Sequence, residues 1–296
     1  MINKTTQFQI IPYQNTDSFN QRVSNFLLRN EALHHAMLSQ FYTITHSAQT
    51  LQQCPELITL ESNGEILAVA INNAGNRVFI SMLTHLDAVD LLAQHLQKYG
   101  TLSMVNAPPN IAQHFAQVWT QLTGQVHKLE MTLCAYRLQQ LHPFTWAKGQ
   151  LRPATTADIS LVNQWFVAFF EEALGSLAHY SQDWVNQQIH EGHVFLWEDG
   201  VPVSMGCKMG EVANGYRVSF IFTPPEYRQK GYGKTCTAAV TKQLLDDGQR
   251  YCFLYADKNN TVTKLMYEAI ARSAAPEAIG YELMGETQNY LFTSSP

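Results

Sequence analysis

The segment VSFIFTPPEYRQKGYGKTCTAAVTKQLLDD, residues 218–247, decides the fold of the C-terminal half of this chain. It opens as an apolar strand, passes through a short loop at 228–233 and enters a helix at once, with Cys236, Val240 and Leu244 on one face. Glycines in such a turn allow positive φ and close backbone approach to a ligand. The helix N-terminus adds unpaired N–H donors and a positive dipole end. The turn therefore predicts a site for a phosphate or pyrophosphate.

Two familiar phosphate motifs do not fit this loop. Gly233-Lys234-Thr235 occurs, but no glycine stands five residues before Gly233, so the loop is not a P-loop. The strand belongs to an antiparallel meander and not to a βαβ unit, which excludes a dinucleotide fingerprint. An ordinary glycine loop without a ligand is the remaining alternative, and the strand-to-helix context favours the phosphate site over it.

The order of strands and helices repeats in the two halves of the chain. Alternating apolar strands joined by Asn63-Gly64, Asp199-Gly200 and Asn214-Gly215 turns indicate a meander in each half, followed by helix, strand, helix and strand. We expect elements at 57–62, 65–72, 77–83, 89–96, 101–106, 111–122 and 128–138, and again at 193–198, 201–209, 216–222, 233–244, 251–256, 261–270 and 281–292.

The second copy is preceded by a helix that Thr155 or Thr156 can cap, with Ile159, Val162, Phe166 and Phe169 as its buried residues. The stretch 142–149 lacks periodicity and reads as a linker. We therefore expect two domains of one α+β fold, each a mixed sheet flanked by helices, at residues 1–141 and 150–296.

Composition excludes several classes of protein. Hydrophobic residues make up 46% and charged residues 15%, which suits a packed core, and the net charge of −5 gives a nucleic acid or an anionic membrane no electrostatic attraction. The start is too polar for a secretory signal, and no apolar run is long enough to span a membrane. The odd, scattered cysteines lack a CxxC pair and indicate reduced core thiols, and the histidines form no ligand pair, so we expect a cytoplasmic protein without a metal.

Segment 218–247 resembles motif A of the GNAT acyltransferase superfamily, whose pattern is R/Q-x-x-G-x-G/A between a strand and a helix. The run FTPPEYRQKGYG, followed by LYADKNNTVTKLMYEAI, is similar to the bacterial branch of predicted acetyltransferases. The likeness is specific over 150–270, whereas before residue 140 it rests on strand order alone. It implies a tandem GNAT-like acyl-CoA N-acyltransferase fold with acetyl-CoA as co-substrate.

The resemblance also implies roles for individual residues. Residues on the strand before the loop would pair through their backbone with the pantetheine arm, the loop itself would hold the pyrophosphate, an asparagine would bind the cofactor near its pantetheine, and a tyrosine would protonate the leaving thiolate. In that order they are Ile221, Phe222 and Thr223; Gln229, Lys230, Gly231, Tyr232, Gly233 and Lys234; Asn260; and Tyr267. On a helix, Asn260 and Tyr267 would lie two turns apart on one face.

The sequence departs from the family in two places. Where many relatives place a glutamate base, this chain has Arg217, so Asp257 is the nearest alternative carboxylate, with an Asx turn or helix cap as its competing role. About eight extra residues, 271–278, follow the tyrosine helix. They either alter the acceptor pocket or form neutral surface.

The expected activity is acetyl transfer to a primary amine of a small molecule or peptide, and a CoA-binding sensor without turnover is the alternative. The aromatic residues at 166–193 either line the site of an apolar or aromatic-bearing acceptor amine or belong to the hydrophobic core. The first copy has Thr84-His85-Leu86-Asp87 in place of the loop, so we expect it to bind no CoA. A homodimer is compatible with these expectations.

Overall fold

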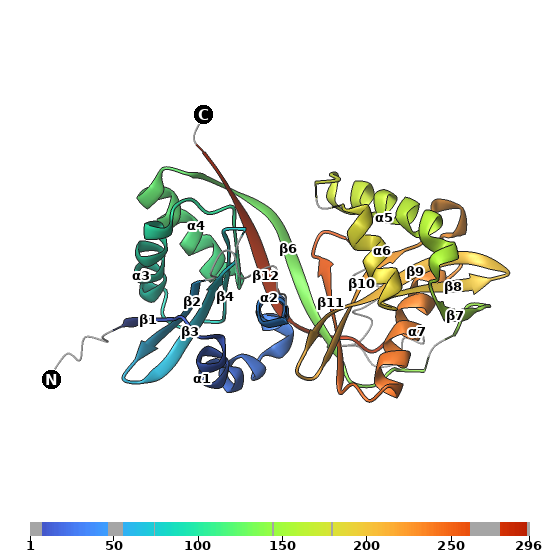
Figure 1. The fold of residues 1–296 in the computed structure, drawn as a ribbon, viewed down its shortest axis with the longest axis horizontal. Helices are drawn as coiled ribbons and strands as arrows, with labels where there is room; N and C mark the ends of the chain where they lie inside the picture. The colour runs from blue at the N-terminus through green and yellow to red at the C-terminus, as the bar shows by residue number, and fades with distance from the viewer. Residues whose placement is uncertain are drawn as a thin grey trace. The chain divides into compact units, whose positions relative to one another are not determined.

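A computed structural model describes residues 8–46, 56–73, 75–143, 145–178, 180–260 and 279–294. The chain forms two compact units (Figure 1). The first comprises the described residues of Met1–Ala135, Ala256–Asn260 and Met284–Pro296, and the second those of Tyr136–Tyr255 and Thr261–Leu283. Each unit is a mixed sheet covered by helices on both faces.

The sheet of the first unit has the order β1-β2-β3-β4-β5-β12-β6. Neighbours up to β4 are antiparallel, β4 and β5 are parallel, and β5 and β12 are antiparallel. The strands are β1 Gln9–Tyr13, β2 Glu56–Ser62, β3 Glu65–Asn72, β4 Arg77–Ile80, β5 Met104–Ala107, β12 Glu282–Thr293 and β6 Val126–Leu138, of which β6 belongs to this unit up to Ala135.

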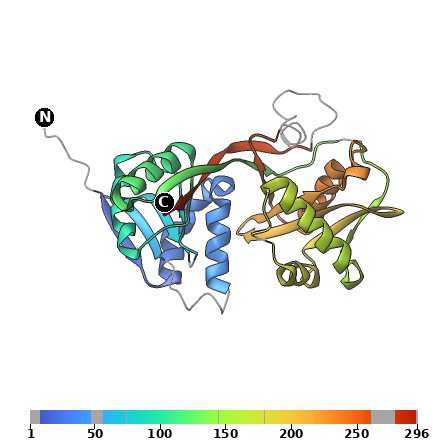
Figure 2. The ribbon, with the colours of Figure 1, turned by 90° about the horizontal axis from the view of Figure 1, so that it is seen from above.

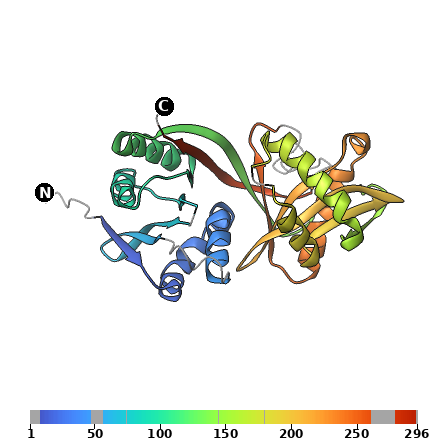
Figure 3. The ribbon, with the colours of Figure 1, turned by 45° about the horizontal axis from the view of Figure 1, so that its top comes forward.

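Opposite faces of this sheet bury alternate residues of each strand, as a pleated strand requires. Ile58 and Val78 pack with helices α3 (Asp87–Leu96) and α4 (Pro109–Thr123), whereas Leu57 and Phe79 pack with α1 (Thr16–Leu28) and α2 (Glu31–His46). Figure 3 shows the two helix pairs on the two sides of the sheet.

The sheet of the second unit has the order β11-β10-β9-β8-β7. Its strands are β7 Gln150–Pro153, β8 Val194–Asp199, β9 Val201–Val212, β10 Gly215–Phe222 and β11 Tyr251–Asp257. β7 to β10 are antiparallel neighbours, and β10 and β11 are parallel. This repeats the pairing order of the first unit, so the duplicated α+β layout expected from the sequence is confirmed.

Helices again cover both faces of the second sheet (Figure 2). α5 (Ile159–Leu174) and α6 (Gln182–His190) pack on one face, and α7 (Tyr232–Asp246) packs on the other against Trp197 and Val203. The start of α5 is fixed by the expected Thr155 cap, which forms a capping box with Asp158 in the 3-10 turn Thr156–Asp158. Arg152 donates two hydrogen bonds, of 2.8 and 2.9 Å, to the Asp158 carboxylate and holds its pKa well below the usual value.

The last strand differs from the sequence expectation, which placed it in the second copy. β12 instead pairs with β5, with Gln288 opposite Ala107 and Leu291 opposite Met104. The ring centre of Phe292 on β12 lies 6.1 Å from that of Trp119 on α4, inside the core of the first unit. The boundaries 1–141 and 150–296 describe two copies along the chain and stay a prediction. In space, β12 from Met284 onward belongs to the first unit, although it follows the second copy in the sequence.

Candidate functional site

The strand-to-helix turn of the second unit is built as an open helix N-terminus. Gly231 is the N-cap of α7 with φ +81°, in the left-handed region that favours glycine, and Gln229 has φ +61°. Thr235 N–H donates to Gly231 O at 3.0 Å and closes the first helical turn. A glycine N-cap has no side chain to accept from the first-turn N–H groups, so these donors suit an anionic ligand.

Side chains behind the turn hold it against the sheet. Thr223 Oγ1 lies 2.9 Å from Ser204 Oγ, and a Cβ on Gly233 would come within 3.0 Å of Thr223 Oγ1. A side chain at Gly233 would therefore crowd Thr223 by a few tenths of an ångström, so close packing favours glycine at this position. Tyr232 donates from its hydroxyl to Asp199 at 2.6 Å, which raises the pKa of the tyrosine and ties the start of α7 to the end of β8.

Two further contacts shape the loop on its exposed side. Arg228 donates from Nε to Thr223 O at 2.9 Å and pairs with Glu172 of α5 at 2.5 Å. Lys230 donates to Glu226 O at 3.3 Å and lies over the Tyr227 ring. The sequence reading missed the roles of Arg228, Ser204 and Asp199 because they act through pairs distant in the chain.

β10 and β11 separate partway along β10, well before this turn. Their register covers Gly215–Arg217 against Tyr251–Phe253, while β10 continues to Phe222. A bulge follows, since the register with β9 shifts between Ser219 and Phe222, and Phe220 has φ +53°. Beyond Arg217, the described residues show no strand paired to the β11 side of β10. An open strand edge of this kind can pair with an extended ligand.

The structure brings the end of β10, with Ile221, Phe222 and Thr223, against the loop from Gln229 to Lys234, since a Cβ on Gly233 would lie 3.0 Å from Thr223 Oγ1. A 3-10 turn at Pro225–Tyr227 connects the strand to the loop. Ile221 packs beneath α7, because a Cβ on Gly206 would meet both its Cδ1 and Cys236 Sγ. By its chemistry, the strand edge suits an extended ligand arm and the helix N-terminus suits a phosphate group.

The other predicted residues lie at the end of β11 and after it. Asp257 Oδ1 accepts from Asn259 N–H at 2.9 Å, and Asn260 N–H donates to Asp257 O at 3.0 Å. Asp257 therefore forms the Asx turn that was its alternative role, and its assignment as a catalytic residue stays a prediction, as does the cofactor role of Asn260. Tyr267, the insertion 271–278 and Cys54 lie outside the described residues.

The aromatics of α5 and α6 pack on one another. Phe166, Phe169, Phe170 and Trp184 all lie within ring-contact distance of Phe220, and they belong to the core between α5, α6 and the sheet. This packing accounts for them, so they carry no information about an acceptor.

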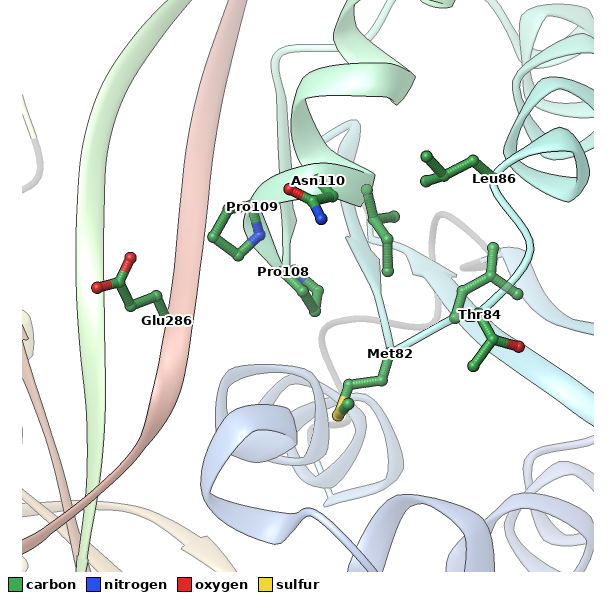
Figure 4. Close-up of a pocket in the computed structure, with 9 residues that line it drawn as sticks. Met82, Thr84, Leu86, Pro108, Pro109, Asn110 and Glu286 are labelled. Atoms are coloured by element: carbon green, nitrogen blue, oxygen red, sulfur yellow. The ribbon is translucent and has the colours of Figure 1, made fainter.

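The first unit has a pocket at the corresponding ends of β4 and β5 (Figure 4). It measures about 480 Å³. Its lining is mostly apolar and consists of Met82, Leu83, Thr84, Leu86, Pro108, Pro109, Asn110, Ile111 and Glu286. α3 begins beside it with Asp87 and Asp90 in its first turn, and carboxylates there repel a phosphate.

A buried histidine also occupies the strand end at this pocket. His34 is placed by a 2.9 Å contact from Nδ1 to Leu27 O, and its Nε2 accepts from Met82 N–H at 3.1 Å. Burial lowers the pKa of His34, so the neutral ring is favoured. The Met82 amide that follows β4 is therefore already bonded within the protein.

Among the described residues, no group of three or more His, Cys, Asp or Glu side chains could hold a metal ion. The described cysteines, Cys134, Cys207, Cys236 and Cys252, are all buried, and burial raises the pKa of Cys236 and Cys252 to about 12. In the same part of the chain, no helix has the length and apolar character needed to cross a bilayer.

Part of the chain matches the model of a known protein family. Residues 159–271 match the model of the acetyltransferase (GNAT) family. No curated protein has a significantly similar sequence. The chain has the fold of a Drosophila protein (TM-score 0.64, 9% identity, 95% of this chain and 98% of that one) and of a GCN5-related N-acetyltransferase from Sphaerobacter thermophilus (0.54, 13%, 96% and 94%). A tandem GNAT protein from the clavulanic acid biosynthesis pathway is also similar (0.50, 10%, 98% and 99%).

The glycine turn, the open strand edge and helix α7 lie within the residues that match this family of acetyltransferases.

Proposed function

We propose that the second unit is an acetyl-CoA-dependent N-acetyltransferase that acts on a primary amine of a small molecule or peptide. One observation carries the proposal: a strand with an open edge leads into a helix whose N-cap is a glycine at φ +81°. The turn from Gln229 to Lys234 would hold the pyrophosphate through backbone N–H groups. The β10 edge at Ile221–Thr223 would pair with the pantetheine arm, which presents the acetyl thioester.

The protein's part in the reaction is to position the amine and move protons. The amine must be neutral to attack the thioester carbonyl, and Asp257 or a water chain would accept its proton. A β10 N–H would stabilise the oxygen as it gains negative charge. The C–N bond forms, the C–S bond breaks, and Tyr267 would donate a proton to the departing thiolate.

The alternative is a CoA-binding sensor without turnover. Two observations favour considering it: the family's base position holds Arg217, and Asp257 is engaged in an Asx turn. Both functions predict acetyl-CoA binding, so binding alone does not separate them.

An acetyl-transfer screen against a panel of amines separates the two functions. We expect CoA release matched by an equal amount of acetylated amine with at least one member. Tight acetyl-CoA binding with no acetylated product across small-molecule and peptide amines would favour the sensor. We expect no nucleic acid or membrane partner, and a homodimer can be tested by light scattering.

A further inference from the structure

Arg217 is a half-buried cation that pairs with no acidic side chain among the described residues. It lies on β10 in the last register pair with β11, opposite Phe253. Its Nε donates to Ser219 Oγ at 2.9 Å, and its guanidinium carbon lies 5.7 Å from the centre of the Tyr255 ring. Among the ion pairs of the described residues, none involves Arg217.

Two other arginines that lie against the sheets pair with carboxylates. Arg22 pairs with Glu61 at 2.8 Å, and Arg152 pairs with both Asp158 and Glu198. Arg217 has only a hydroxyl and an aromatic face, and desolvation lowers its pKa. A guanidinium has five N–H donors, and burying one without an anion is unfavourable. The arrangement is therefore incomplete without an anionic ligand.

Position decides which anion this can be. Phe222, where β10 ends, lies five positions after Arg217 in the chain. At about 3.3 Å per residue the separation is roughly 16 Å, so Arg217 is remote from the pyrophosphate turn. It stands instead at the inner end of the open β10 edge, where β10 and β11 diverge. An extended arm held at the turn would end there with its acyl group.

We propose that Arg217 binds the carboxylate of the acceptor, and that the acceptor is an amine that also carries a carboxylate, as a free amino acid does. The transfer part of this inference rests on the proposed function, whereas carboxylate binding does not. Ser219 and the Tyr255 ring hold the guanidinium from one edge and one face, which leaves its fork for two parallel hydrogen bonds to a carboxylate.

The test compares matched ligands that differ only in the carboxylate. In the acetyl-transfer assay, each α-amino acid is paired with its carboxamide. In calorimetry with CoA present, each N-acetyl-amino acid is paired with its carboxamide, which gives a readout independent of turnover. The protein is the full chain as wild type, Arg217→Gln, Arg217→Lys and, as control, Arg250→Gln. Arg250 is an exposed arginine that also lies over an aromatic ring, that of Tyr251 at 5.0 Å.

We expect the wild type to prefer carboxylates, and Arg217→Gln to raise KM and Kd for them by roughly 100-fold while KM for acetyl-CoA stays unchanged. Arg217→Lys should restore part of the loss, because it keeps the charge and lacks the fork. Arg250→Gln should behave as wild type. Preference without transfer would support the carboxylate site and contradict the proposed function.

Equal use or binding of carboxylates and carboxamides by the wild type would overturn the inference. So would an Arg217→Gln variant that melts like wild type, keeps the carboxylate preference and loses acetyl-CoA affinity. In that case the arginine would bind the cofactor.

Discussion

Replacing Gly231 by valine tests how the turn at the start of α7 works. A Cβ at Gly231 would meet nothing within 4 Å, so the substitution introduces no clash. Its effect comes from φ +81°, which a residue with a side chain adopts at about 1–2 kcal/mol. The chain relieves this strain by rotating the peptide, and the rotation turns the first N–H groups of α7 away from the phosphate.

The expected size follows from these two effects. Strain of about 1–2 kcal/mol lowers the melting temperature of a unit of this size by roughly 2–8 °C. Loss of one hydrogen bond to a charged phosphate, about 1.5–3 kcal/mol, weakens acetyl-CoA binding by roughly 10- to 100-fold. Thermal unfolding and calorimetry with acetyl-CoA measure the two quantities separately.

A matched control lies at the other end of the same helix. Gly248 has φ +92°, is exposed and also has nothing within 4 Å of an added Cβ. Gly248→Val should lower the melting temperature by a similar amount and leave acetyl-CoA affinity unchanged. Undiminished binding in Gly231→Val, or an equal loss in both variants, would refute a phosphate site at this turn.

Three further predictions concern the remaining parts of the chain. Calorimetry should give one acetyl-CoA per chain, because carboxylates begin α3 beside the pocket of the first unit; a second site would contradict this. Tyr267→Phe should keep acetyl-CoA affinity and lower kcat by roughly 10²–10⁴-fold, and near-wild-type kcat with chemistry rate-limiting would exclude it as the acid. Burial lowers the pKa of His34 from its unfolded value of about 6.5. As the pH drops below about 6.5, the free energy of unfolding should therefore decrease, by up to about 1.4 kcal/mol per pH unit. Urea unfolding at several pH values should show this slope in the wild type and lose it in His34→Gln.

Local signals in the sequence predicted most of the fold. The Asn-Gly turns fixed the meanders, and Gly124 ends α4 in a left-handed conformation as a stop signal should. Several elements were not predicted, namely β1, β7, α1, α2 and α6. Two of them, α1 and α6, have little net hydrophobicity and depend on packing for their stability.

The exchange of β12 could not be predicted, because the alternation of a strand indicates which face is buried and not which sheet it joins. Its Tyr290 and Phe292 would suit the core of either copy, and they fill that of the first unit.

The candidate site divides in the same way. The glycine turn is a contiguous motif and was predicted with its strand and helix. Arg217 drew attention only as a departure from the family. Which described side chains surround Arg217 depends on the tertiary structure and cannot be seen in the sequence. The same is true of the contact between Ser204 and Thr223 behind the turn.

The most direct test of the account is acetyl transfer measured with wild type, Gly231→Val and Gly248→Val side by side. The assay follows CoA release and the acetylated amine together, with acetyl-CoA near its KM in the wild type. We predict equal amounts of both products in wild type and Gly248→Val, and at least a 10-fold lower rate in Gly231→Val. Wild-type protein that binds acetyl-CoA and acetylates none of the amines, or a Gly231→Val rate equal to that of Gly248→Val, would contradict it.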